Sequence, residues 1–213
     1  MTTIEARPTF TWGRAIRGIR RRVRHAFGTK DIQWARVVMD AETSSYVKSL
    51  NFQSMNALEI SGTKWANLGF NCYRSIDYPD YDICSGPLEP AGFDIIIAEQ
   101  VFEHILWPYR AVKNVYTMLK PGGVFIVTTP FLLRIHNCPV DCSRWTPLGL
   151  RHLLAEGGFP LESTEAHSWG NRACVRSNFR DWRKWTVWLH SLKNEHDFPV
   201  VVWAYATKPK SAK

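Results

Sequence analysis

Acidic side chains stand at the ends of three apolar stretches, where an open parallel sheet would place a ligand. Glu59 lies near the end of NALEI, Asp77 follows NCYRSI, and Glu99 follows DIIIA. In such sheets the ligand lies at the carboxyl ends of the strands. A carboxylate at the end of the second strand is well placed to accept hydrogen bonds from both hydroxyls of a ribose. These positions therefore predict a nucleoside site.

The loop after the first stretch is poor in glycine, and this restricts the class of ligand further. Only Gly62 follows Glu59, whereas a dinucleotide-binding fingerprint would place three glycines there. One glycine still lets the backbone approach a ligand closely. The pattern argues against a bound pyrophosphate and favours a ligand that has a ribose but no phosphate.

The loop 131–145 follows a predicted strand and contains a second group of reactive side chains. Long polar loops in this position commonly carry function. His136 and Asp141 are candidate acid–base residues, and Arg144 is placed to pair with Asp141 or with substrate oxygens. The alternative is that Asp141 and Arg144 only pin the loop and cap the next helix. The spacing H-x-C-x2-D-C fits no regular zinc pattern. We therefore predict no metal site, and magnesium bound by carboxylates is the less favoured alternative.

The hydrophobic pattern predicts a strand–helix–strand unit over residues 93–130. Its first strand runs from Asp94 to Ala98, residues 120–123 (KPGG) stop the helix and form a tight turn, and residues 124–129 form the second strand. The two strands of such a unit are parallel. Glu99-Gln100 and residues 128–130 stand at the strand ends, so they are the first places to look for a site.

The remaining elements follow from the same patterns. Further strands are predicted at 56–60, 71–78, 160–168 and 199–207, and Ile83 is counted as the edge of a short third strand. Helices are predicted at 31–53 and 178–193. Another begins at Thr146-Pro147, with Thr as N-cap and Pro at the first helical position, and ends at the glycine pair 157–158.

The net charge of +8 is concentrated in the first 30 residues, which hold eight arginines and lysines against one glutamate. We predict a basic amphipathic arm over residues 1–30, a single domain over 31–207 and a frayed tail over 208–213. The apolar face of a helix at 10–27 would pack on the domain or on a second subunit. Alternatively, the arm docks on an anionic surface such as a phosphate-bearing substrate, nucleic acid or lipid headgroups.

Cysteine usage and hydropathy predict a cytoplasmic protein. The five cysteines are odd in number and scattered, which favours a reducing compartment over a disulfide framework. We expect no membrane-spanning helix, because no run of 18 apolar residues occurs. The N-terminus also lacks the apolar region of a secretory signal.

The ordered motifs LEISG, SID, DI, FDIIIAEQVFEHI, LKPGG and VFIVTTP resemble class I S-adenosylmethionine-dependent methyltransferases of the methyltransferase type 11 kind. The resemblance covers about residues 50–165. It implies an α/β, Rossmann-like, mostly parallel seven-stranded sheet with helices on both faces. The antiparallel last strand of that sheet would be PVVVWAYAT. The implied cofactor is S-adenosyl-L-methionine.

The resemblance also assigns cofactor-binding positions. Glu59 and Gly62 would line the methionine end, and Asp77 would hold the ribose. The other implied cofactor contacts are Asp82 and Ile83 beside the adenine, and Glu99, Gln100 and Val101 along the cofactor border. The first loop, SGTKWAN, departs from the GxGxG that the family usually has, but the intact acids favour retained binding.

Methyl transfer to a hydroxyl needs a general base within hydrogen-bond reach of the acceptor. We rank His136 first as the base, with Asp141 orienting it or binding substrate, and His104 as a further candidate whose alternative role is to position a helix. Arg144, Trp145 and Trp169 are candidate substrate contacts, although the tryptophans could instead pack in the core or in a dimer.

The segment HNCPVDCSRWTPLGLRHLL looks like the post-strand loop of small bacterial methyltransferases found with surface-glycan genes. This resemblance implies a saccharide hydroxyl as acceptor, of the methylmannose polysaccharide type. The expected partners are a small-molecule or saccharide substrate, an anionic surface at the arm, and a second copy in a homodimer. Two alternatives stay open: a nucleic-acid or protein methyltransferase guided by the arm, and a non-catalytic methyltransferase-like binding module.

Overall fold

The structure, a computed structural model, describes residues 28–210. The predicted arm therefore lies outside the described residues except for its last three. The strands are β1 Thr29–Gln33, β2 Asn56–Ile60, β3 Cys72–Ile76, β4 Phe93–Glu99, β5 Leu119–Pro130, β6 Thr164–Trp169, β7 Lys184–Thr186 and β8 Val201–Thr207. The α-helices are α2 Val37–Ser49, α3 Pro108–Met118, α4 Pro147–Glu156 and α5 Arg172–Asn178. Short 3-10 turns lie at Trp34–Arg36, Phe52–Ser54, Phe102–His104 and Leu161–Ser163.

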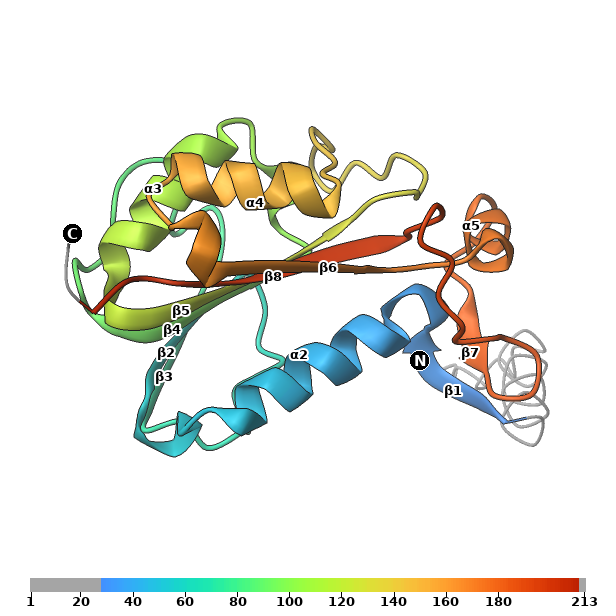
Figure 1. Ribbon diagram of the computed structural model, residues 1–213, viewed down its shortest axis with the longest axis horizontal. Coiled ribbons are helices and arrows are strands. Elements are labelled where there is room, and N and C mark those ends of the chain that lie inside the picture. Colours follow the sequence, from blue (N-terminus) through green and yellow to red (C-terminus); the bar gives the residue numbers. More distant parts are fainter. Residues whose placement is uncertain (1–27, 211–213) are drawn as a thin grey trace, which may run out of the picture.

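Six strands form the main sheet, in the order β3-β2-β4-β5-β8-β6, and β1 pairs with β7 in a separate two-stranded sheet (Figure 1). Strands β3, β2, β4 and β5 run parallel to one another, and β8 is antiparallel to both β5 and β6. This arrangement is the Rossmann-like α/β fold expected from the sequence, with the antiparallel strand supplied by the predicted segment.

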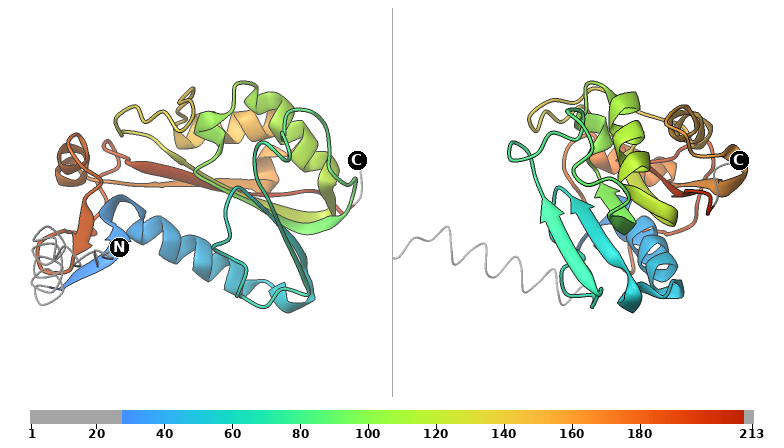
Figure 2. Two further views of the ribbon diagram at one scale, coloured as in Figure 1. Left: turned by 180° about the vertical axis from the view of Figure 1, so that it is seen from behind. Right: turned by 90° about the vertical axis from the view of Figure 1, so that its left-hand side faces the viewer.

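Helices cover both faces of the main sheet. Helix α2 lies on one face, and α3 and α4 lie side by side on the other (Figures 1 and 2). The alternation of strand side chains divides the core accordingly. In β4, Ile95 and Ile97 pack with Met39 of α2, whereas Ile96 packs with Val112 of α3. A strand buried on both faces is why β4 reads as an unbroken apolar run.

Several predicted elements are confirmed. Strands β4 and β5 are parallel and joined through α3, as the strand–helix–strand pattern requires. Helix α4 begins where predicted, because the Thr146 side chain accepts a hydrogen bond from the Gly149 N–H and Pro147 occupies the first turn. The helix ends at the predicted glycine pair.

The prediction of a third strand is wrong, so the main sheet of the described residues has six strands and not seven. The segment around Ile83 is a turn, in which the Asp82 carboxylate accepts hydrogen bonds from the Cys84 N–H and the Ser85 hydroxyl. An Asp side chain that bonds nearby backbone groups favours a turn over a strand.

The helix predicted at 178–193 is also wrong. Instead the chain forms the end of α5, then β7 paired with β1, and then turns. The Trp185 indole and the Thr186 N–H both bond to His190, at 3.1 and 2.9 Å. Leu189, one of the apolar residues at helical spacing in this segment, is 75% exposed, so the expected helix face has no surface to pack against.

Two element boundaries differ from the sequence prediction. The region 31–53 begins with strand β1 and a 3-10 turn before α2, since residues 29–33 pair with β7. Residues 120–123 turn as predicted at Gly122, whose φ is 81°, yet they remain within β5. Gly123 is required there because an added Cβ would lie 2.9 Å from the Lys120 carbonyl oxygen.

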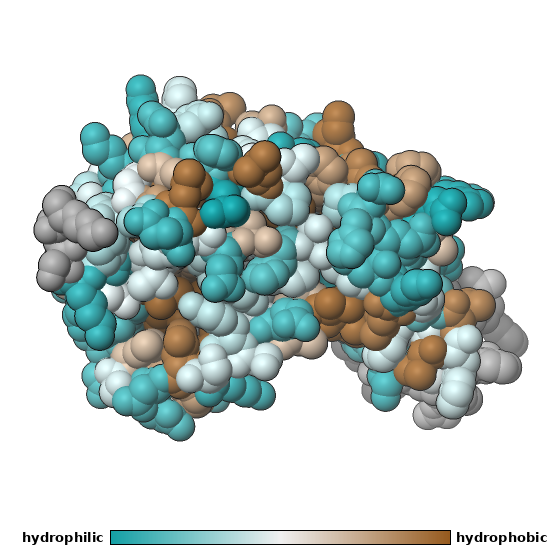
Figure 3. Space-filling view, in the orientation of Figure 1, coloured by the Kyte–Doolittle hydropathy of each residue, from teal (hydrophilic) through white to brown (hydrophobic). Residues whose placement is uncertain are grey.

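On the face seen in Figure 3, hydrophilic residues dominate and apolar residues gather in patches, one of them toward β1 and β7. Among the helices of residues 28–210, none has the length and apolar character needed to cross a membrane.

Candidate functional site

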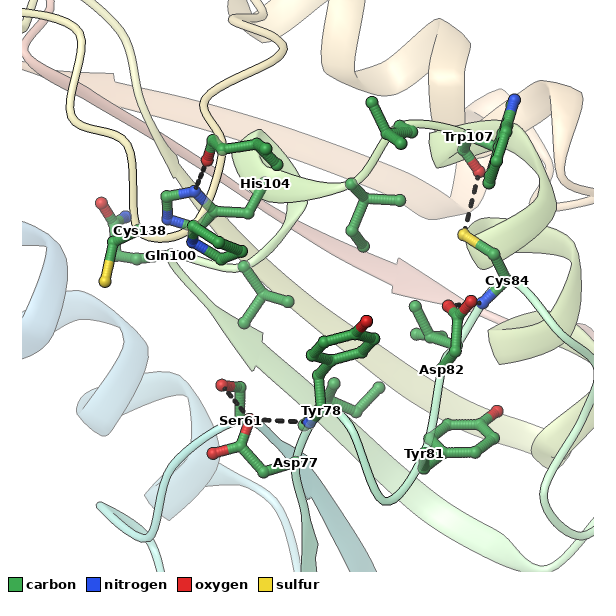
Figure 4. A pocket seen from close by; sticks show the side chains of 17 residues that line it. Ser61, Asp77, Tyr78, Tyr81, Asp82, Cys84, Gln100, His104, Trp107 and Cys138 are labelled. Atoms are coloured by element: carbon green, nitrogen blue, oxygen red, sulfur yellow. Dashed lines mark hydrogen bonds between the residues drawn. The ribbon is translucent and has the colours of Figure 1, made fainter.

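A cleft of about 480 Å3 opens at the carboxyl ends of β2, β3 and β4 (Figure 4). Ser61, Asp77 and Tyr78 stand on one side of it, while Gln100, His104 and Cys138 stand on the other (Figure 4). The remaining lining residues are Ile60, Tyr81, Asp82, Ile83, Cys84, Val101, Ile105, Leu106, Trp107, Pro139 and Val140. The sequence-predicted edge of the sheet therefore does carry a cleft.

Asp77 is held at the rim of the cleft by the end of the neighbouring strand. Its Oδ1 accepts hydrogen bonds from the Ser61 hydroxyl at 2.8 Å and from the Tyr78 N–H at 2.9 Å. Both donors bond the same oxygen, and the carboxylate is exposed to the cleft side. This geometry fixes the acid in a position where a polyhydroxylated ligand can donate to it.

The two residues predicted beside the adenine also line the cleft. Asp82 is oriented by the Cys84 N–H at 2.8 Å, and Ile83 is buried with its carbonyl bound by the Asn114 side chain at 2.7 Å. Tyr81 and Trp107 add aromatic surface to this end of the cleft. A flat apolar ring such as a nucleobase fits this lining.

The strand ends on both sides of the cleft have left-handed backbones without being glycine. The φ angles of Ser61 and Gln100 are 60° and 56°. Such conformations cost on the order of 1 kcal/mol or more and persist only where the surroundings impose them. Thr128 imposes the conformation of Gln100. The Thr128 carbonyl accepts a hydrogen bond from the Gln100 backbone N–H at 2.9 Å, and the Thr128 hydroxyl accepts one from the Gln100 side-chain amide at 3.1 Å.

Glu59 and Gly62 do not line the cleft. Glu59 is 3% exposed, and it accepts hydrogen bonds from the backbone N–H groups of Lys64 and Trp65 at 3.0 Å and from the Tyr73 hydroxyl at 2.6 Å. This contact and burial raise the pKa of Tyr73. An added Cβ at Gly62 would lie 3.1 Å from Glu59 Oε1. The two residues thus shape the first loop without lining the cleft.

Glu99 is not among the cleft residues either, and it belongs to a cluster of four charges. Its carboxylate bonds Arg36 and Lys64, each at 2.8 Å, and both cations also contact Asp40. Sequence reasoning missed Arg36 and Lys64, because the spacing of surface cations along a chain does not indicate which acid they meet.

The loop after β5 forms a rigid acid–base group. Asp141 bonds both terminal nitrogens of Arg144 and accepts the His136 N–H at 2.8 Å. The guanidinium lowers the Asp141 pKa to about 2. His136 Nδ1 lies 3.3 Å from Asp141 Oδ2, and burial lowers the His136 pKa, so its ring is neutral at pH 7.

The His136 ring lies beside His104, which does line the cleft. Their ring centroids are 5.2 Å apart, and the Trp182 ring lies 5.3 Å from His136 on another side. His104 Nδ1 contacts the Val140 carbonyl (Figure 4). The three predicted acid–base residues are therefore brought together, and of them His104 lines the cleft while His136 and Asp141 lie next to it.

Glu103 is the important residue of this group that sequence reasoning missed. Its side chain is fully buried, with Oε1 3.6 Å from His104 Nε2 and 4.0 Å from His136 Nε2. Burial raises its pKa to about 7. Its carbonyl accepts the Cys142 N–H at 2.7 Å, which ties the loop to the 3-10 turn after β4. The only signal in the sequence was an acid next to His104 in FEHI.

The predicted substrate contacts have different positions. Arg144 is engaged with Asp141, and Trp145 is half-buried against the core that includes α4. Trp169 is 2% exposed and its indole N–H donates to the Leu192 carbonyl at 2.9 Å. A ring enclosed in the core cannot contact a sugar, so Trp169 is withdrawn as a substrate residue.

Known proteins resemble this chain in part of its sequence and in its fold. A family model described as a methyltransferase domain matches residues 41–127. A probable S-adenosylmethionine-dependent methyltransferase of Mycolicibacterium smegmatis is 36% identical over 103 residues, which are 41% of this chain and 38% of that protein. The chain thus matches about two fifths of the length of this curated relative.

Solved structures share the fold at low sequence identity. One belongs to the complex of the Haloferax volcanii Trm112 methyltransferase activator with a methyltransferase (TM-score 0.54, 13% identity, 84% of this chain and 96% of that one). Another is phosphoethanolamine N-methyltransferase 2 of Haemonchus contortus with S-adenosyl-L-methionine (TM-score 0.54, 13% identity, 79% of this chain and 52% of that one). A third is an Archaeoglobus fulgidus S-adenosylmethionine-dependent methyltransferase (TM-score 0.53, 14% identity, 81% of this chain and 94% of that one). These likenesses confirm the predicted fold class.

Proposed function

We propose that this chain is an S-adenosylmethionine-dependent methyltransferase whose cofactor binds in the cleft at the ends of β2, β3 and β4. The observation that carries the proposal is the Asp77 carboxylate, which Ser61 and the Tyr78 N–H hold at the rim of the cleft. The methyltransferase-domain match over residues 41–127 and the bound S-adenosyl-L-methionine of the Haemonchus contortus enzyme support it.

The lining of the cleft suits the parts of this cofactor. Asp77 would accept the ribose hydroxyls, and Asp82 and Ile83 would flank the adenine next to the aromatic rings. Gln100 and Val101 would border the cofactor where its sulfonium lies. Glu59, Gly62 and Glu99 are not among the cleft residues, and they would contribute by fixing the first loop and the charges around Lys64.

The proposed acceptor is a hydroxyl of a sugar, oligosaccharide or glycolipid. Transfer from a sulfonium is a displacement in which the protein aligns the nucleophile and excludes water. A hydroxyl must also lose its proton, and neutral His136 has the acceptor nitrogen for this step. Asp141 would hold the ring and stabilise the imidazolium that forms. The indole of Trp182 beside His136 offers the kind of face on which sugar C–H groups pack.

Calorimetry with S-adenosyl-L-methionine tests the cofactor site. Asp77→Asn should weaken binding by about 10- to 100-fold, because a charged acceptor of two hydrogen bonds becomes neutral. Asp80→Asn is the matched control, since Asp80 is exposed in the same segment and is not among the cleft residues. No binding by the intact chain, or equal binding by the Asp77 variant, would reject the proposed site.

A methyl-transfer screen with radioactive cofactor tests the acceptor class. Saccharide, lipid, RNA and peptide acceptors should be compared, with labelling expected for saccharides alone. In the active assay, His136→Ala should keep cofactor affinity and lose turnover by at least about 100-fold. Near-normal turnover of this variant would remove His136 from the role of base.

A further inference from the structure

The Glu103 carboxylate is buried without a hydrogen-bond partner, which is rare for a charged group. Its side chain has no exposed surface, and neither Oε1 nor Oε2 has a donor among residues 28–210. Buried polar groups are almost always paired, and an isolated buried charge costs several kcal/mol or more. The Glu103 oxygens therefore remain available to a ligand.

Two imidazole nitrogens face the same carboxylate. His104 Nε2 lies 3.6 Å and His136 Nε2 lies 4.0 Å from Glu103 Oε1. One ligand atom from each of the three residues can be chosen so that all lie within 4.8 Å of one another. Three donors from two separate segments thus converge on one point beside the cleft.

The other nitrogen of each ring lies near an oxygen atom of the protein, with hydrogen-bond geometry at His104 Nδ1 but not at His136 Nδ1. His104 Nδ1 contacts the Val140 carbonyl, and His136 Nδ1 lies 3.3 Å from the Asp141 carboxylate, which Arg144 holds in place. The Val140 carbonyl can only accept, so it keeps the proton on His104 Nδ1 and leaves the lone pair on Nε2, and the charge of Asp141 favours the same tautomer of His136. Histidines that bind metal ions are commonly oriented in this way.

We propose that Glu103, His104 and His136 bind a divalent transition-metal ion such as Zn2+. Two imidazoles and one carboxylate form a donor set that suits Zn2+ and related ions, whereas Mg2+ prefers oxygen ligands and bound water. Bonds of about 2.0–2.2 Å would draw the three ligand atoms together by roughly 1 Å. The ion would also neutralise the orphaned carboxylate.

The site was not visible in the sequence, because its donors are split between the turn after β4 and the loop after β5. Of the three ligands, only His136 belongs to the cysteine-containing segment H-x-C-x2-D-C. The exposed Cys138 and Cys142 are not part of the proposed donor set. The inference goes beyond methyl transfer, since metal binding can be measured without cofactor or acceptor.

Cobalt titration of the full chain tests the site. The protein should carry no histidine tag and be stripped with a chelator. One equivalent of Co2+ should give the visible absorption of a nitrogen- and oxygen-bound ion, and Zn2+ should displace it. Glu103→Gln and His104→Ala should each weaken binding by at least about tenfold, because each removes a ligand. His167→Ala is the matched control, since His167 lies 3.8 Å from an acid in an exposed pair.

Thermal unfolding with and without Zn2+ guards against variants that fold poorly. A ligand that binds only the folded state raises its stability, so Zn2+ should raise the melting temperature of the parent and of His167→Ala but not of the Glu103 variant. The proposal is overturned if the parent binds no Co2+, if Glu103→Gln binds as tightly as the parent, or if the spectrum shows thiolate ligation. None of these results would bear on S-adenosyl-L-methionine binding.

Discussion

Replacing Glu103 by glutamine should make the metal-free protein more stable above neutral pH. Burial raises the Glu103 pKa from 4.5 to about 7, so the folded protein binds this proton more tightly than the unfolded chain does. Its favourable contribution is therefore complete below pH 4.5 and is lost as the pH rises toward 7. At about 1.4 kcal/mol for each pKa unit, the loss is about 3 kcal/mol.

Urea unfolding in the presence of a chelator measures this effect. Glu103→Gln keeps the shape of the side chain and cannot ionise, so its stability relative to the parent should rise by about 3 kcal/mol between pH 4.5 and pH 8. Comparison with the parent at each pH cancels the titration of other groups. Glu165→Gln is the control, because Glu165 is 76% exposed.

A difference between Glu103→Gln and the parent that does not change with pH would refute the argument. It would mean that the carboxyl group finds solvent or a donor in the folded protein. In that case the orphaned carboxylate would no longer support a metal site either, which makes this measurement a separate check on that inference.

Three further predictions concern the same group of residues and the fold around it. Arg144→Gln should destabilise the protein by about 2 kcal/mol at pH 7, since Arg144 lowers the Asp141 pKa from 3.8 to about 2. The stabilisation by this pair is present above pH 3.8 and is lost as the pH falls toward 2. Urea unfolding should therefore show that the difference in stability between parent and variant shrinks in acid. Gly157→Ala should lower the melting temperature, because the new Cβ would lie 2.1 Å from Val112 Cγ1 and overpacking costs about 1–3 kcal/mol, whereas Gly149→Ala within the preceding helix α4 should be tolerated. Saturating Zn2+ should inhibit the proposed methyl transfer and a chelator should restore it, because His136 Nε2 cannot bind a cation and accept a proton together; activation by Zn2+ would contradict the assignment of His136 as base.

Local patterns identified most of the main sheet. The apolar runs of β4 and β5 are long enough to be strands and too short for helices, and burial on both faces is what makes them continuous. Thr146-Pro147 determined where α4 begins, because an N-cap needs only neighbouring residues. The site position followed as well, since parallel strands bring their carboxyl ends to one edge.

Signals that depend on distant partners were misjudged. The residues 178–193 have helical spacing, but pairing with β1 draws Lys184–Thr186 into a strand. Helical periodicity predicts a helix only when another surface covers the apolar face, and that surface is a tertiary property. The prediction that Trp169 contacts the substrate is wrong for a similar reason, because its neighbours in the sequence do not reveal that the fold encloses its ring.

The sequence by itself determined the fold class, the strand ends and the choice of Asp77, His104, His136 and Asp141 as candidates, because these depend on residue type and short spacing. Tertiary structure alone decided how they combine. It left Glu59 and Glu99 outside the cleft lining, where backbone amides bind the first and two cations bind the second. It also buried Glu103 against two histidines. Convergence of side chains and loss of solvent are set by packing between distant segments, and no local pattern encodes them.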